Sequence, residues 1–265
     1  MTNMDAGQVR SVARRAENQD ALLMAARVGY AINGVLHLLI GWIALSLAWR
    51  LGASESADQS GALGALASNT FGRFLLWVAV VGWLGLGLWH LLQAVLSRGE
   101  VKDRLKYAAK GLTYLALAWL AFAFARGTGS SSSQQTSDFT ASLMSQPFGT
   151  ALVILVGLVT VGVGVYHIHK GWKRKFLADL QEQPGETVEK LARFGYIAKG
   201  VALIVVGGLF GIAALENDPD EATGLDGALK TLLEAPAGQW IVTLVALGFI
   251  AFAVYSFVRA KKARV

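Results

Sequence analysis

The chain has 265 residues, of which 54% are hydrophobic and only 16% are charged, and its formal net charge is +6. Because soluble domains carry about 25% charged residues, this composition excludes an ordinary soluble fold. The sequence contains no cysteine, which excludes thiolate catalysis, zinc–thiolate sites and iron–sulfur clusters. We therefore expect an integral membrane protein.

Six continuous apolar runs follow one another along the chain. They span residues 28–49, 74–96, 105–125, 150–169, 194–215 and 239–258. Each is close to the roughly 20 helical residues that cross a bilayer core about 30 Å thick. The four prolines lie between the runs, and the runs lack the alternation of barrel strands. The sequence predicts an all-α polytopic membrane protein with six transmembrane helices.

Positive charge gathers on alternate connections between these runs. Twenty of the 24 lysines and arginines lie in residues 1–27, 98–110, 170–199 and 259–265, whereas the 18 acids divide equally between the two sides. The positive-inside rule then predicts that both termini are cytoplasmic. We expect no nucleic-acid partner, because these cations form no separate basic domain.

Three of the runs open with the same pattern, R-x-x-Y-x-x-N/K-G. Its tyrosines are Tyr30, Tyr107 and Tyr196, related by shifts of 77 and 89 residues. The second run of each unit obeys the same shifts, which carry Trp89 to Tyr166 and Tyr255. Because each two-helix unit returns the chain to its starting side, we predict three parallel repeats with pseudo-threefold symmetry about the membrane normal.

The repeats divide the chain into six parts. They are a cytoplasmic N-terminal arm (residues 1–26), repeat 1 (27–99), repeat 2 (104–176), a cytoplasmic linker (177–192), repeat 3 (193–260) and a cytoplasmic tail (261–265). Apolar spacing in the arm allows a modest helix on the membrane surface. Weakly amphipathic stretches at residues 61–67, 139–144 and 225–233 predict short helices at the outer interface.

The three openings resemble those of a bacterial membrane family catalogued as domain of unknown function 1206. The resemblance covers about residues 25–260 and implies six spans in three tandem repeats, with no established activity. It places the chain in the bacterial plasma (inner) membrane as a multi-pass protein. The sequence departs from a perfect repeat at Asn33, Ala237 and Ser256, where other repeats have Lys, Phe and His.

The tyrosine, Asn or Lys, and glycine of each opening share one helix face. Lys110 and Lys199 lie about 9 Å inside their boundary arginines by helical rise, where a cation needs a partner or must extend to the headgroups. His90 and His167 are expected near the same end. The candidate site is therefore a ring of Tyr30, Asn33, Tyr107, Lys110, Tyr196, Lys199, His90 and His167.

Two interpretations of this ring stay open. As a site, it would bind an anion at the inner leaflet, such as a lipid phosphate, a fatty carboxylate or a small anion. As a folding motif, its lysines would reach the headgroups, its tyrosines would join the interfacial belt and its glycines would permit close packing. His37 is expected near mid-membrane as a packing residue.

No catalytic constellation is apparent, so we predict neither an enzyme nor catalytic residues, a metal site or a cofactor. The primary hypothesis is a non-catalytic membrane protein that binds anionic lipid, or a membrane or envelope partner, as a scaffold or accessory subunit. A small-anion or lipid transporter or pore built on the repeats is the alternative. Haem held between His37 and His90 or His167 is a weaker one.

Overall fold

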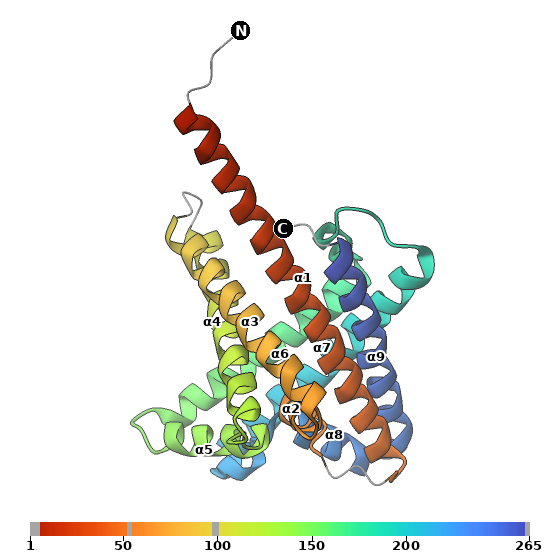
Figure 1. Ribbon diagram of the computed structural model, residues 1–265. Helices are drawn as coiled ribbons and strands as arrows, with labels where there is room; N and C mark the ends of the chain where they lie inside the picture. Colours follow the sequence, from red (N-terminus) through yellow and green to blue (C-terminus); the bar gives the residue numbers. More distant parts are fainter. Residues whose placement is uncertain (1–5, 52–54, 97–100, 263–265) are drawn as a thin grey trace.

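The structure is a computed structural model that describes residues 6–51, 55–96 and 101–262. Within these ranges the chain is helical and forms no β-strand (Figure 1). Six of the described helices are long and apolar enough to cross a membrane. They are α1 (Ala6–Ala48), α3 (Thr70–Leu96), α4 (Val101–Ala125), α6 (Gly149–Trp172), α7 (Glu186–Glu216) and α9 (Gly238–Lys262). The predicted all-α class with six spans is confirmed.

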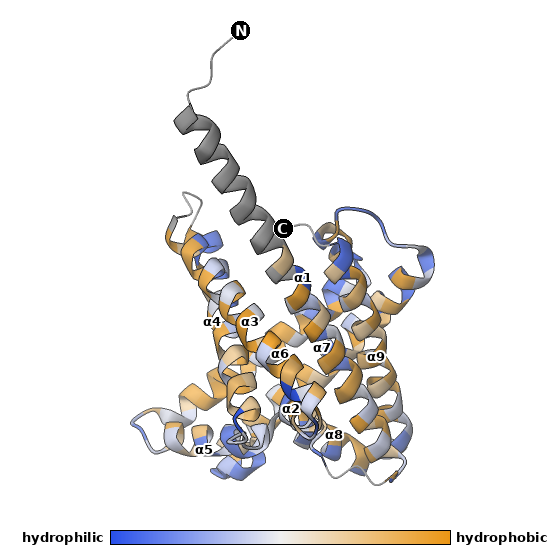
Figure 2. Cartoon of the chain, in the orientation of Figure 1, coloured by the Kyte–Doolittle hydropathy of each residue, from blue (hydrophilic) through white to orange (hydrophobic). Residues whose placement is uncertain are grey.

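The N-terminal arm is not a separate surface helix. α1 continues without a break from Ala6 to Ala48, and Figure 1 shows it projecting beyond the other helices. Figure 2 shows apolar residues dominating the long helices, with hydrophilic residues concentrated in the connections and helix ends. We call the end at which α6 and α9 finish, with Lys170 and Arg259, the basic end.

Three short helices lie together at the end opposite the basic end (Figure 1). They are α2 (Gln59–Ala67), α5 (Ser132–Met144) and α8 (Gly224–Glu234), close to the three predicted stretches. The Ser132 backbone N–H donates to Ser60 Oγ at 3.0 Å, and the Ala57 N–H donates to Asp226 Oδ1 at 2.8 Å. Leu63 and Leu229 are fully buried, so these helices pack into the protein and close this end.

A tight turn joins each short helix to the next long helix. Gly72, Gly149 and Gly238 occupy the same place in the three repeats. A Cβ on these glycines would collide with the carbonyl oxygens of Leu66, Leu143 and Leu233. The repeated glycine is therefore required by the close approach of backbone to backbone.

The most extensive helix packing joins neighbouring repeats. α3 packs on α4, α6 packs on α7, and α9 packs on α1, which closes the cycle between the ends of the chain. We call these three contacts the seams. Within a repeat, α7 packs on α9 and α1 packs less extensively on α3, whereas α4 and α6 make no substantial contact. The ring of helices is therefore open between α4 and α6.

Glycines form the seams at equivalent positions. A Cβ on Gly200 of α7 would lie 2.5 Å from the carbonyl oxygen of Gly164 in α6, and one on Gly111 of α4 would lie 3.1 Å from that of Gly87 in α3. Gly34 of α1 is the third equivalent and faces the ring of Phe257 in α9. Small residues let the backbones approach where lipid offers no hydrophobic drive for helix association.

Two smaller elements complete the described chain. The 3₁₀ helix η1 (Lys175–Asp179) lies in the connection from α6 to α7, and η2 (Pro219–Glu221) precedes α8. Asn217, which caps the C-terminus of α7, has the left-handed conformation with φ at 53°, as is common at helix C-termini. α9 carries Arg259, Lys261 and Lys262 in its last turn, where their positive charges interact favourably with the negative end of the helix dipole.

Candidate anion sites at the seams and on the axis

Six of the eight predicted site residues, all except Lys110 and Lys199, make contacts at the three seams. At the α3/α4 seam the His90 and Tyr107 ring centroids are 6.2 Å apart, and at the α6/α7 seam those of His167 and Tyr196 are 5.9 Å apart. At the α9/α1 seam, Asn33 Nδ2 donates to Ser256 Oγ at 3.2 Å. Each second-helix residue therefore faces the opening motif of the next repeat. Tyr30 lies at the α9/α1 seam too, with the Arg259 guanidinium 4.2 Å from its ring centroid.

Lys199 contacts a histidine that the sequence pattern did not assign to the ring. Its Nζ lies 3.0 Å from His37 Nε2, and His37 Nδ1 lies 2.8 Å from the Asn33 carbonyl oxygen. Because a carbonyl oxygen only accepts, Nδ1 carries the proton, and Nε2 accepts a hydrogen bond from Lys199. The Lys199 ammonium also lies 4.6 Å from the Phe252 ring centroid. Among the described side chains, no carboxylate forms an ion pair with Lys199.

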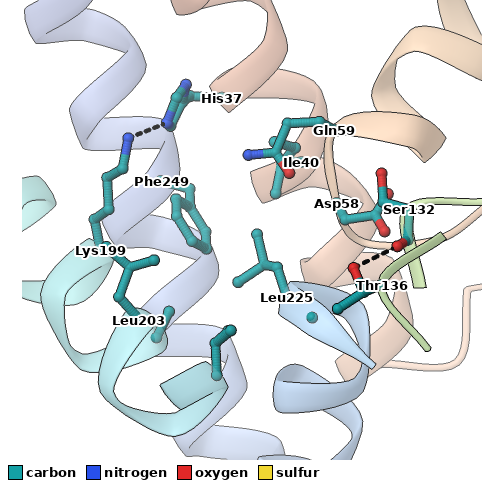
Figure 3. Close-up of a pocket in the computed structure, with 13 residues that line it drawn as sticks. His37, Ile40, Asp58, Gln59, Ser132, Thr136, Lys199, Leu203, Leu225 and Phe249 are labelled. Atoms are coloured by element: carbon teal, nitrogen blue, oxygen red, sulfur yellow. Dashed lines mark hydrogen bonds between the residues drawn. The ribbon is translucent and has the colours of Figure 1, made fainter. Parts of the chain in front are cut away.

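Lys199 and His37 line a central cavity of about 220 Å³ (Figure 3). Its walls are mostly apolar and include Ile40, Leu203 and Phe249, and the polar residues Asp58 and Ser132 line it as well. The short helices contribute Gln59, Thr136 and Leu225, which the repeat shifts of 77 and 89 residues relate to one another. Three equivalent positions around one cavity place it on the pseudo-threefold axis. We call it the axial cavity.

Lys110 has different surroundings from Lys199, although the two are equivalent in the repeats. Its side chain is exposed and lies within electrostatic range of Lys106, Arg259, Lys170 and Asp179. It does not line the axial cavity. Lys110 thus belongs to a basic cluster contributed by α4, α6 and α9.

A segment between α6 and α7 closes the basic end. Phe176 of η1 is fully buried and stacks on Tyr196, with ring centroids 5.5 Å apart. It also makes an edge contact with Tyr255 at 5.4 Å, whose hydroxyl donates to the Phe176 carbonyl oxygen at 3.1 Å. The next acid, Asp179, pairs with Lys170 at 2.6 Å and lies 3.8 Å from Arg259.

Sequence analysis assigned no role to Asp179. The carboxylate is only 23% exposed, between cations from two helices. No local signal distinguishes it, because its partners come from the ends of α6 and α9. Glu182, by contrast, is exposed beside Lys262 at 2.8 Å, and the hydrogen bond from that ammonium lowers the pKa of Glu182.

A buried carboxyl group begins the first short helix. Asp58 Oδ1 accepts hydrogen bonds from the Ser60 hydroxyl at 2.6 Å and from the Gly61 backbone N–H at 3.0 Å. Its Oδ2 has no hydrogen-bond partner among the described atoms. Burial raises the pKa of Asp58, because desolvation disfavours the charged form. The helices α5 and α8 have no side-chain cap of this kind.

Six apolar helices, arranged as tandem pairs and joined by glycine seams, define a polytopic α-helical membrane protein built by repetition. A family model described as Domain of Unknown Function (DUF1206) matches the chain three times, at residues 28–97, 105–174 and 194–263. The chain belongs to this family, which confirms the resemblance seen in the opening motifs.

A curated relative is similar to this chain over most of its length. The chain is 30% identical over 247 residues to a Bacillus subtilis (strain 168) protein with the printed name "Uncharacterized protein YxxB", and the match covers 88% of each chain. No solved structure gives a significant match.

Proposed function

We propose that this protein is a non-catalytic integral membrane protein that binds the anionic headgroup of a membrane lipid at Lys110. The observation that carries the proposal is the exposed Lys110 ammonium, which has three further cations and one carboxylate within electrostatic range. The carboxylate, Asp179, is already shared by Lys170 and Arg259. A phosphate or carboxylate headgroup would supply the negative charge that this cluster lacks.

The opening between α4 and α6 supports a lipid as the source of that anion. The two helices make no substantial contact, and both carry exposed apolar side chains, among them Leu112 and Leu158. Acyl chains can cover such surfaces without loss of hydrogen bonds, because both helices satisfy their own backbone groups. With both termini cytoplasmic, as the distribution of basic residues predicts, the headgroup would belong to the inner leaflet.

The test compares lipids retained by purified variants. Lys110→Met should retain about fivefold less phosphatidylglycerol in native mass spectra, which corresponds to about 1 kcal/mol for one headgroup contact. Lys230→Met is the matched control, because Lys230 is exposed at the opposite end and pairs with Asp226. Retention of phosphatidylcholine should not change. Equal retention of phosphatidylglycerol by Lys110→Met and the unmodified protein would reject the site.

A competition experiment separates the lipid from a free anion of the same chemistry. Excess inorganic phosphate should leave phosphatidylglycerol bound, because the acyl chains contribute to lipid affinity and free phosphate has none. Complete displacement at millimolar phosphate would show that the cluster is a free-phosphate site.

Transport of a small anion is a second candidate, favoured by the axial cavity on the repeat axis. Anion flux into protein-containing vesicles would support it. Haem ligation by His37 is poorly favoured, because both of its ring nitrogens already form hydrogen bonds. A Soret absorption band in the purified protein would nevertheless establish haem binding.

A further inference from the structure

The axial cavity is lined by a cation, Lys199, that forms no ion pair with a described carboxylate. The carboxyl group of Asp58 also lines the cavity, and its Oδ1 is occupied by hydrogen bonds from Ser60 and Gly61. A lysine ammonium has three N–H donors, and for Lys199 the described partners are the neutral His37 imidazole and the face of the Phe252 ring. An ammonium withdrawn from water is costly unless it is paired. An anion that enters the cavity would therefore be held strongly by Lys199.

His37 orients this ammonium and leaves its charge in place. Its protonated Nδ1 faces the Asn33 carbonyl oxygen, so that Nε2 can only accept from Lys199. The imidazole is buried and packs against Phe252 with ring centroids 4.7 Å apart. These contacts hold the amine at one end of the cavity, and Figure 3 shows Lys199 and His37 together at that end.

The rest of the cavity suits an apolar body. The volume of about 220 Å³ is bounded mostly by apolar surface, with polar groups of Asp58, Ser132 and Thr136 at parts of the wall, whereas one water molecule occupies about 30 Å³ of liquid volume. A bare inorganic ion would leave most of these walls without contacts. Figure 3 shows the Gln59 amide across the cavity from Lys199, where it could meet a polar group at the far end of a ligand.

We infer that the axial cavity binds a small organic carboxylate. Its oxygens would accept from Lys199 Nζ, and its apolar body would lie among Ile40, Leu203 and Phe249. This site is independent of the proposed lipid site, because Lys110 does not line the cavity and Lys199 lies in different surroundings. Each lysine can therefore be replaced as a control for the other.

Binding can be measured by isothermal titration of the full-length protein in mild detergent. Benzoate and hexanoate are the probes, and the uncharged benzamide and hexanamide are their neutral counterparts. At least one carboxylate should bind saturably, and its amide should bind at least tenfold more weakly. Lys199→Met should weaken carboxylate binding at least tenfold, while Lys110→Met should leave it unchanged. Absence of saturable binding by both carboxylates, or equal binding by Lys199→Met, would overturn the inference.

A second variant keeps the test decisive if Lys199→Met does not fold. Leu203→Trp retains the ammonium and fills the cavity, so it should also weaken carboxylate binding at least tenfold. Unchanged affinity in Leu203→Trp would show that the carboxylate binds elsewhere. Phosphatidylglycerol retention by Lys199→Met should equal that of the unmodified protein, so failure of the lipid site and failure of the cavity site give different results.

Discussion

Lys110 and Lys199 occupy the same position of the repeat, yet the structure gives them different surroundings. Lys110 is exposed beside other cations on the open side of the ring. Lys199 is partly buried, hydrogen-bonded to His37 and part of the axial cavity. Equivalent residues in a tandem repeat therefore share a helix face and a depth, while their neighbours decide what chemistry each can perform.

The difference follows from how the two helices are packed. α7 packs on α6, on α9 and on the short helix α8, whereas α4 packs on α3 and touches α2. The missing contact between α4 and α6 leaves Lys110 at an opening. The connection between α6 and α7 also packs the Phe176 ring against Tyr196 and Tyr255. Substitutions in these regions test whether the unequal contacts carry unequal stability.

The largest effect is expected from Phe176→Ala, which removes a fully buried aromatic ring from the closed side. Loss of such a ring should lower the free energy of unfolding by about 3–5 kcal/mol. Chemical unfolding in detergent, followed by tryptophan fluorescence, measures the change. Phe71→Ala is the matched control, because Phe71 is 71% exposed, and its loss should be much smaller. Equal losses would show that Phe176 does not stabilise the basic end.

The next largest losses of stability are expected from Gly→Ala substitutions at the seams, and these losses should differ between seams. A Cβ on Gly200 would lie 2.5 Å from the Gly164 carbonyl oxygen, whereas on Gly34 it would meet the ring of Phe257 at 2.8 Å. Backbone cannot move aside as easily as the partly exposed Phe257 side chain. Gly200→Ala should therefore destabilise the protein by about 2–3 kcal/mol and Gly34→Ala by about 1 kcal/mol.

A third glycine provides the control for this pair. Gly208 lies on α7, and a Cβ there would meet nothing within 4 Å. Gly208→Ala should be neutral or stabilising by up to about 1 kcal/mol, since alanine is the better helix former. The same unfolding assay applies to all three variants. A loss for Gly208→Ala as large as that for Gly200→Ala would contradict the proposed role of backbone contact at the seam.

A smaller effect than that of Gly200→Ala is expected at the cap that distinguishes α2 from α5 and α8. Asp58→Ala removes the acceptor of two hydrogen bonds and should cost about 1–2 kcal/mol. Asp58→Asn keeps an oxygen at that position, so its loss should be smaller at neutral pH. Thermal unfolding of both variants would measure this difference, and equal losses would show that the capping oxygen is not the important group.

The same residue predicts a pH dependence. Burial raises the pKa of Asp58 in the folded protein, so the folded state binds this proton more tightly than the unfolded state. The resulting stabilisation is complete below the unfolded-state pKa and is lost as pH rises through the folded-state pKa. Asp58→Asn should lack this decline when unfolding is measured across that interval. An unchanged pH profile would show that Asp58 does not titrate as proposed.

Hydropathy and repetition were sufficient to predict the spans and the tandem units. The runs correspond to the six long helices, and the glycine at the start of α6 is explained by its contact with Leu143. The same reasoning placed eight residues in one ring, and the structure adds the pair contacts that it did not specify, His90 with Tyr107 and Asn33 with Ser256. Sequence reasoning also did not predict that His37 of α1 is the hydrogen-bond partner of Lys199.

The amino-acid sequence by itself determined the number of spans, their threefold repetition and the family, because these depend on apolar length and on residues a fixed distance apart. Only the tertiary structure decided that α9 packs on α1, that His37 meets Lys199 across 162 residues, and that Asp179 is enclosed. The physical reason is that lipid and protein interior are both apolar. The apolar composition of a helix therefore shows that it lies within the membrane but does not show which helix it packs against. That choice depends on close packing between backbones that are distant along the chain.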